Sequence, residues 1–166
     1  MNLFVTVGST SFVELVDSVT STEFLEELSS QGFTQVTVQY GTSKDIFLNN
    51  IKEYKGSIKI KGYDYKPSID DDMKSANVII CHSGSGTILH GLRLHKKLIV
   101  IVNETLMNNH QAELAQAMAM ENYVIYGDYR NLTFHLSQIA KQELKPYPQP
   151  DPSIFANILD KQMGFI

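Results

Sequence analysis

Glycine and hydroxyl residues crowd a short segment of the sequence, HSGSGT, which runs from His82 to Thr87. Gly84 and Gly86 allow the backbone to turn tightly and to approach a ligand closely, and the serine and threonine hydroxyls add hydrogen-bonding groups. An apolar run typical of a buried strand precedes the segment and a run of helical spacing follows it, so the free amides of a helix N-terminus face the loop. The pattern predicts a site for a diphosphate group. The alternative is a glycine-rich turn that Thr87 caps without any ligand.

The loop departs from three familiar catalytic and nucleotide-binding motifs. No lysine follows the glycines, as the P-loop pattern GxxxxGK[ST] requires, and the spacing is not that of GxGxxG. A hydrolase built on Ser83 or Ser85 is also disfavoured, because the GxSxG motif would need a glycine where Cys81 stands. These departures argue against ATP hydrolysis, dinucleotide binding and serine hydrolysis.

His90 follows Thr87 by three residues, which places both side chains on one face of the predicted helix. From that position the imidazole could reach a sugar or a base beside the phosphates. A solvent-exposed helix histidine with no ligand is the alternative.

A second polar cluster follows the next apolar run, in the segment NETLMNNHQ from Asn103 to Gln111. Asn108, Asn109, His110 and Gln111 gather hydrogen-bond donors and acceptors at a predicted helix start, which is what sugar hydroxyls require. If the two apolar strands are neighbours, this cluster lies beside the glycine-rich loop. Ordinary capping of the helix by Asn108 is the alternative.

Two further segments give weaker signals. Gly8 ends the first apolar run, and Ser9 and Thr10 after it could bind an anion or cap a helix. The acidic run Asp70 to Asp72 invites a metal-binding interpretation, but it opens a predicted helix, where the helix dipole favours acidic residues. We therefore interpret the acidic run as a helix start and predict no metal site.

The elements that must position these residues alternate along the chain. Short β-branched runs predict strands, and segments of helical spacing lie between them, so the sequence predicts a parallel α/β sheet. The runs VIIC and LIVIV are continuously apolar, as expected for central strands covered by helices on both faces. Ligands of such sheets bind beyond the carboxyl ends of the strands. The predicted strands are 3–7, 35–40, 58–60, 76–81, 98–102 and 123–126, and the longer predicted helices between them include 13–30, 46–54, 87–94, 108–121 and 132–142.

Composition bounds the class of protein. The 166 residues are 43% hydrophobic and carry a formal net charge of −4, without any long basic run, which argues against binding to nucleic acid. The single cysteine, Cys81, and an opening run without a basic region or cleavage site lead us to expect a cytosolic protein. No apolar stretch approaches the ~20 residues that a membrane-spanning helix needs. Any membrane contact is therefore expected through a partner or a surface helix.

Proline punctuates the end of the chain and suggests its domain organisation. Four prolines fall in the stretch KPYPQPDP, which is typical of a stiff extended connector. We expect a nucleotide-sugar-binding domain over residues 1–144, a connector over 145–152 and a helix over 153–166. An apolar stripe of Ile154, Phe155, Ile158, Leu159 and Met163 would allow this helix to dock on a partner or on the domain itself.

The motifs together resemble the C-terminal domain of the MurG-like family 28 glycosyltransferases. Over nearly the full chain, the sequence is also similar to the catalytic subunits of the eukaryotic two-component UDP-N-acetylglucosamine transferases of dolichol-linked oligosaccharide synthesis. The blocks that carry the resemblance are FVTVGST (4–10), QYG (39–41), CHSGSGTIL (81–89), LRL (92–94), LIVIVNETLMNNHQ (98–111) and LKPYP (144–148).

The resemblance implies a Rossmann-like fold that forms the C-terminal, donor-binding half of a GT-B enzyme. The implied reaction transfers N-acetylglucosamine from UDP-N-acetylglucosamine to dolichyl diphosphate N-acetylglucosamine, with inversion and without a metal or cofactor. The acceptor half would be a separate, membrane-anchored subunit that recruits this chain to the cytosolic face of the endoplasmic reticulum. A non-catalytic UDP-sugar-binding or regulatory module is the alternative function.

The resemblance also implies roles for individual residues. The glycine-rich loop would hold the diphosphate and sugar, residues 109–111 would contact the N-acetylglucosamine, and residues 8–10 would face the acceptor. His90 departs from the family pattern, which commonly has an acidic residue there that binds the ribose hydroxyls. His110 is the candidate general base, because a histidine ionises near neutral pH, and a base on the partner is the alternative. The expected substrate-binding residues are Gly8, Ser9, Thr10, His82, Ser83, Gly84, Ser85, Gly86, Thr87, His90, Asn109 and Gln111.

Overall fold

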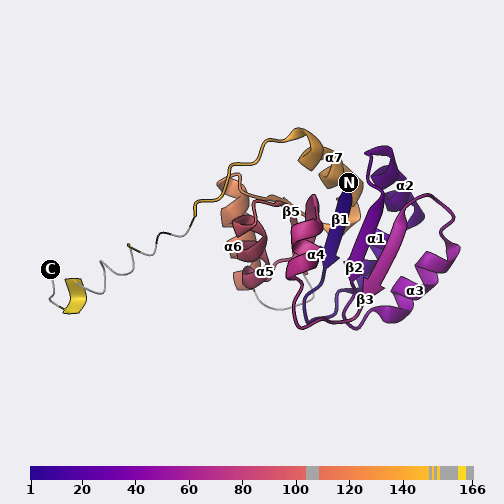
Figure 1. Ribbon diagram of the computed structural model, residues 1–166, viewed down its shortest axis with the longest axis horizontal. Coiled ribbons are helices and arrows are strands. Elements are labelled where there is room, and N and C mark those ends of the chain that lie inside the picture. The colour runs from indigo at the N-terminus through magenta and orange to yellow at the C-terminus, as the bar shows by residue number, and fades with distance from the viewer. Residues whose placement is uncertain (104–108, 150, 152, 154–160, 164–166) are drawn as a thin grey trace.

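The computed structural model describes residues 1–103, 109–149, 151, 153 and 161–163, and of residues 109–111 it describes the backbone. Within these residues six strands form one sheet in the order β3-β2-β1-β4-β5-β6, and every neighbouring pair is parallel. In Figure 1 the arrowheads of β1 and β3 point toward the lower edge of the view. The strands are β1 (Asn2–Thr6), β2 (Gln35–Gln39), β3 (Lys59–Tyr63), β4 (Val78–His82), β5 (Lys97–Ile101) and β6 (Ile125–Gly127).

Helices cover both faces of this sheet. The residues of α1, α2, α3 and α7 pack against one face, and those of α4, α5 and α6 pack against the other. The helices are α1 (Val13–Thr20), α2 (Thr22–Ser30), α3 (Lys44–Glu53), α4 (Asp70–Ser75), α5 (Ser85–Arg93), α6 (Asn109–Met120) and α7 (Leu132–Lys141), with a 3₁₀ turn at Tyr129–Asn131. The predicted parallel sheet between two helical layers is therefore confirmed.

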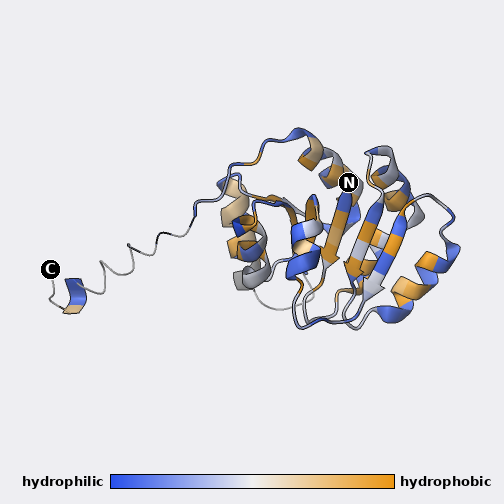
Figure 2. Cartoon of the chain, viewed as in Figure 1, coloured by the Kyte–Doolittle hydropathy of each residue, from blue (hydrophilic) through white to orange (hydrophobic). Residues whose placement is uncertain are grey.

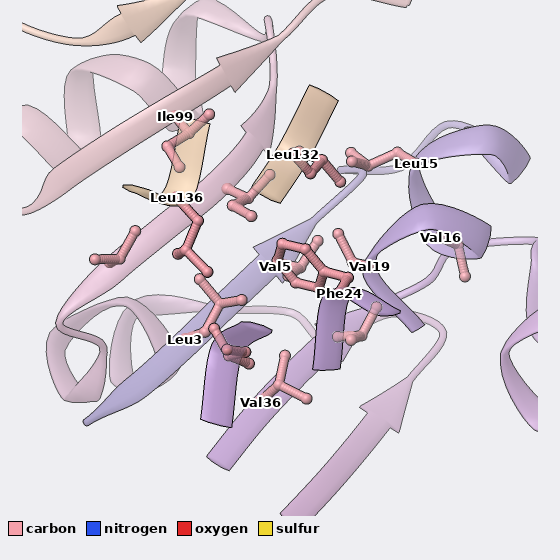
Figure 3. Packing of buried hydrophobic residues seen from close by; sticks show 14 of the residues in the cluster. Leu3, Val5, Leu15, Val16, Val19, Phe24, Val36, Ile99, Leu132 and Leu136 are labelled. Carbon is pink, nitrogen blue, oxygen red and sulfur yellow. The ribbon is translucent and has the colours of Figure 1, made fainter. Parts of the chain in front are cut away.

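The hydrophobic core consists of two layers, one on each side of the sheet. Successive residues of the central strands alternate between them: Leu3 and Val5 of β1 belong to the first layer, and Phe4 belongs to the second. Figure 3 shows Leu3 and Val5 packed with residues of α1, α2 and α7, and Figure 2 shows the apolar strands at the centre of the molecule. The continuous apolar runs VIIC and LIVIV lie in β4 and β5, each of which has a neighbour on either side. Burial on both faces explains why these runs do not alternate.

The helix predicted over residues 13–30 is wrong, because the chain breaks it at Ser21. Ser21 has extended backbone angles, φ −64° and ψ 146°, and its hydroxyl accepts a hydrogen bond from the amide of Phe24 at 3.2 Å. A serine at this position caps the second helix instead of continuing the first. Two shorter helices, α1 and α2, result.

The proline-rich segment packs back against the domain as far as Gln149. The amide of Lys145 donates to the carbonyl of Asn122 at 2.8 Å, and the ring of Tyr147 lies edge-on to that of Tyr123 with 5.1 Å between centroids. No regular secondary structure occurs from residue 142 to 149. Of the helix predicted over 153–166, the residues Ile154, Phe155, Ile158 and Leu159 lie outside the described part of the chain. Among the described helices, none has the length and hydropathy needed to cross a membrane.

Candidate functional site

Three of the predicted site segments meet at one edge of the sheet. β1, β4 and β5 are adjacent and parallel, with Thr6 opposite Cys81 and His82 opposite Ile101. The segments that follow these strands therefore leave the same carboxyl edge, where α/β sheets bind ligands. The structure brings residues 8–10, residues 83–87 and Asn103 together, as the sequence predicts. The Asn103 side-chain amide donates to the carbonyl of Ser11 at 3.2 Å, which ties the β5 end to the β1 end.

The His82 ring lies between Gly8, in the segment after β1, and Gly84, in the glycine-rich loop after β4. A Cβ added at Gly8 would lie 2.5 Å from Cε1 of the His82 ring, and one added at Gly84 would lie 2.4 Å from its Nε2. Gly8 also has a φ of +67°, which side chains rarely allow. Burial lowers the pKa of His82, so a neutral ring fills this space. The two glycines thus make room for the imidazole, and the imidazole fixes the spacing of the two segments.

Hydrogen bonds fix the segment after β1 and leave one hydroxyl exposed. Thr6 Oγ1 donates to Gln39 Oε1 at 2.5 Å and accepts from the amide of Gly8 at 3.0 Å. The Thr10 hydroxyl donates to the carbonyl of Val7 at 2.9 Å, so its proton is used within the loop. Ser9 is exposed. Of the two predicted hydroxyls, Ser9 is therefore the one that faces solvent.

The glycine-rich loop leads into a helix start without a side-chain cap. α5 begins at Ser85 with Gly84 as the N-cap residue. The predicted helix start at Thr87 is therefore wrong, and so is the alternative in which Thr87 caps the turn. The first intrahelical bond runs from the amide of Ile88 to the carbonyl of Gly84 at 3.1 Å, which leaves the amides of residues 85–87 unused by the helix.

Exposure differs between the residues of this loop. Ser83 is buried at 1% exposure, whereas Ser85 and Gly86 are exposed. A Cβ added at Gly86 would meet no atom within 4 Å. The start of α5 therefore presents open space beside amides that can bind an anion, as the diphosphate interpretation requires.

His90 is held by an acidic residue from the neighbouring helix. Its Nε2 lies 2.8 Å from Oδ1 of Asp70, the first residue of α4. Asp70 also pairs with Lys74, and the pKa of its carboxyl is lowered first by Lys74 and then by His90. The His90 side chain is 40% exposed as well as bonded to Asp70, so its contact with a ligand stays a prediction. No sequence pattern connects Asp70 with His90, because they lie 20 residues apart on different helices.

Asp72, the last acidic residue of α4, also has partners. The Tyr63 hydroxyl donates to Asp72 Oδ2 at 2.5 Å, and the Lys66 ammonium lies 2.8 Å from the same oxygen. Across the described residues, no three His, Cys, Asp or Glu side chains gather closely enough to hold a metal ion. The acidic run acts in the structure as a helix start with local ion pairs.

Asn109, His110 and Gln111 form the first turn of α6, which begins beyond the carboxyl end of β5. Their side chains, together with residues 104–108 and hence Asn108, lie outside the described part of the chain. Their contact with a sugar stays a prediction.

Two hollows lie on opposite edges of the sheet. The larger, about 510 Å³, lies at the amino ends of the strands and includes none of the predicted site residues; Met1, Phe33, Leu136 and Ile139 are among its lining. Lys96 also lines this hollow. Its ammonium group is already engaged, because it donates hydrogen bonds to the backbone carbonyls of residues 74 and 76. A hollow of about 470 Å³ lies at the carboxyl edge instead. It is lined by Gly8, Ser9, Gly41, Thr42, Lys44, Asp64 and Tyr65.

Residues 2–161 match the glycosyltransferase family 28 C-terminal domain. The chain belongs to this family. The UDP-N-acetylglucosamine transferase subunit ALG13 of Yarrowia lipolytica is 32% identical and covers 99% of this chain and 85% of its own length. The protein of the same name from Homo sapiens is 37% identical over 79% of this chain, which corresponds to 11% of that longer protein.

Solved structures agree with this family membership. The NMR solution structure of ALG13 superimposes with a TM-score of 0.72 and 29% identity, covering 95% of this chain and 94% of that one. MurG of Acinetobacter baumannii gives a TM-score of 0.68 at 13% identity, over 85% of this chain and 41% of MurG, and so shows the fold alone. The predicted architecture, the C-terminal half of a GT-B fold, is confirmed.

Proposed function

We propose that this family 28 chain is the donor-binding subunit of an inverting glycosyltransferase. It transfers N-acetylglucosamine from UDP-N-acetylglucosamine to dolichyl diphosphate N-acetylglucosamine, the second step of lipid-linked oligosaccharide assembly for protein N-glycosylation. The observation that carries the proposal is the uncapped start of α5 at the carboxyl edge, with open space at Gly86. The relatives named UDP-N-acetylglucosamine transferase subunit ALG13 support the choice of donor.

The UDP diphosphate binds at the start of α5, where the amides of residues 85–87 point beyond the helix and the helix dipole favours negative charge. Ser83 to Thr87 line this diphosphate site, and His82 sets its distance from Gly8. Asn109 and Gln111, which open α6 next to it, hydrogen-bond the N-acetylglucosamine.

His90 lies one turn into α5 and hydrogen-bonds a ribose hydroxyl. Because the carboxylate of Asp70 only accepts hydrogen bonds, the pairing favours the His90 tautomer that has its proton on Nε2. Its other nitrogen, Nδ1, is then an acceptor, as a carboxylate oxygen would be. The His90 imidazole thereby accepts a hydrogen bond from the ribose hydroxyl, as the acidic residue that family members commonly have at this position would.

The reaction is a displacement at the anomeric carbon of the donor sugar. The 4-hydroxyl of the acceptor attacks, a new carbon–oxygen bond forms on one face, and the bond to the diphosphate breaks on the other. UDP leaves with the bonding electrons, and the α5 amides stabilise the charge that develops on it. His110 accepts the proton of the attacking hydroxyl. In this scheme the chain's own groups stabilise the leaving group, so the mechanism uses no metal or cofactor.

The acceptor comes from a second polypeptide. A GT-B site is formed between two halves, and this chain supplies one of them. We infer that the other half is a membrane-anchored subunit that holds this chain at the cytosolic face of the endoplasmic reticulum. The C-terminal segment 153–166 packs on that subunit.

The test is transfer of labelled N-acetylglucosamine from UDP to dolichyl diphosphate N-acetylglucosamine. The chain alone, membranes with the partner alone, and the two combined are compared. The proposal predicts transfer from the combination only. Transfer by the chain alone would contradict the two-subunit site, and no transfer in any arm, with UDP binding retained, would favour the non-catalytic binding module.

A further inference from the structure

The hollow at the carboxyl edge that includes Gly8 and Ser9, here termed the β1–β3 groove, is separate from the start of α5. Its lining comes from the segments that follow β1, β2 and β3, and it encloses about 470 Å³. The glycine-rich loop follows β4, on the other side of β1. The groove and the diphosphate site therefore lie on either side of the segment Gly8 to Thr10.

Fixed backbone contacts form the base of this groove. Gly41 has a φ of +56°, and a Cβ added there would lie 2.5 Å from the carbonyl oxygen of Thr10. The segments after β1 and β2 thus touch through a position that only glycine fills without strain. Gly8 is fixed in turn by its hydrogen bond to Thr6 and by the His82 ring. The base of the groove is therefore built before any ligand arrives.

An exposed tyrosine stands at the rim of the groove on an anchored loop. Tyr65 is 63% exposed, although neighbouring residues hold its loop in place. Its amide donates to Asp64 Oδ1 at 2.6 Å, and Lys66 both pairs with Asp72 and lies 3.9 Å from the centroid of the Tyr63 ring. The Tyr65 side chain is thus exposed to solvent on a short loop that follows directly from β3 and that the Lys66–Asp72 ion pair ties to α4.

The polar groups of the groove match a sugar that carries phosphate. The Asp64 carboxylate and the hydroxyls of Ser9 and Thr42 can hydrogen-bond sugar hydroxyls. Lys44, exposed at the first position of α3, makes no ion pair with any described residue. Its ammonium and the positive end of α3 favour an anion. An aromatic face beside a carboxylate suits a saccharide, and the cation suits a diphosphate.

We propose that the β1–β3 groove binds the acceptor, with the acceptor sugar against Tyr65 and its diphosphate toward Lys44. This inference rests on the proposed function, because it takes the donor diphosphate to lie at the start of α5. The acceptor then approaches the donor sugar across Gly8 and Ser9. Its binding site is shared between the partner and this chain.

The test is steady-state kinetics of the complex with partner membranes, using dolichyl diphosphate N-acetylglucosamine as the varied substrate. We expect Tyr65→Ala to raise the KM for this acceptor roughly three- to tenfold, since an aromatic contact is lost. Tyr65→Phe keeps the ring and should keep the KM. Lys44→Ala should raise the acceptor KM roughly two- to fivefold, less so at high salt. The KM for UDP-N-acetylglucosamine should not change in any of these variants.

Phe134→Ala is the matched control, because Phe134 is 64% exposed and lies on α7, away from the groove. An unchanged acceptor KM in Tyr65→Ala would overturn the inference while the proposed function stands. If the Tyr65→Ala chain no longer associates with the partner membranes while its acceptor KM is unchanged, the partner itself covers the groove and the inference is wrong. Failure of the unaltered complex to use this acceptor would instead refute the proposed function and the inference with it.

Discussion

The two glycines of the HSGSGT loop should respond to alanine in opposite ways. A Cβ at Gly84 would lie 2.4 Å from Nε2 of His82, and the ring cannot move away freely because it also fills the space at Gly8. We expect Gly84→Ala to lower the free energy of unfolding by about 1–3 kcal/mol, the usual cost of overpacking. For a chain of this size, that corresponds to a fall in Tm of roughly 2–4 °C per kcal/mol.

A Cβ at Gly86 would meet no protein atom, so Gly86→Ala should not destabilise the fold. Gly86 is the second residue of α5, and alanine there should raise the free energy of unfolding by up to about 1 kcal/mol. The same methyl group would occupy the space into which the diphosphate binds. We expect the affinity for UDP to fall roughly tenfold, or about 1.4 kcal/mol.

Urea denaturation and calorimetric titration with UDP measure the two effects separately. Loss of stability in Gly86→Ala would show that the space beside Gly86 at the start of α5 is not open. Unchanged UDP affinity in a stable Gly86→Ala protein would refute the diphosphate site. Equal stability of Gly84→Ala and the unaltered chain would refute the packing of His82 between the glycines.

Three further predictions follow from the site and the core. Asp70→Ala should free the His90 ring from its partner and so weaken its contact with the ribose. The ratio of the affinities for UDP and for 2′,3′-dideoxy-UDP, measured by calorimetry, should then fall by a factor of about 2–10. An unchanged ratio would show that His90 does not contact the ribose. His110→Ala should lower the transfer rate of the complex by ~10²–10⁴ while UDP binding persists, and full activity would move the general base to the partner. Burial raises the pKa of the Cys81 thiol to about 12, so the native chain should resist thiol reagents at pH 8, and fast labelling without unfolding would contradict its burial. Because unfolded cysteine ionises near pH ~8.5, the folded state binds more protons above that pH, and the stability from Cys81 should be lost as pH rises toward 12.

The sequence predicted the sheet and its ligand-binding edge well, because both depend on patterns that a single strand or helix carries. The apolar runs of β4 and β5 identified central strands, and the parallel order then brought the segments after Val7, Cys81 and Val102 to one edge. Strand β3 was predicted at residues 58–60 but runs from Lys59 to Tyr63. Its lysines are exposed at the edge of the sheet, so its hydrophobic pattern is weak.

What the sequence could not predict depends on contacts between distant segments. The break at Ser21 arises because a serine can either continue a helix or cap the next one, and packing decides between them. The Asp70–His90 pair joins two helices, and the His82 ring between Gly8 and Gly84 joins two loops. The Thr10 hydroxyl, expected as a ligand contact, donates its proton to the Val7 carbonyl, which no spacing rule would indicate. The β1–β3 groove likewise needs three segments whose proximity only the fold reveals.

The most direct test of donor binding at the start of α5 is a titration of the isotope-labelled chain with UDP-N-acetylglucosamine, followed by backbone amide NMR. We expect the largest shifts at residues 83–87 and 109–111. Small shifts are expected around Phe33 and Lys96, which line the larger hollow at the opposite edge. Shifts concentrated at that opposite edge, or none at residues 85–87, would refute donor binding at the start of α5.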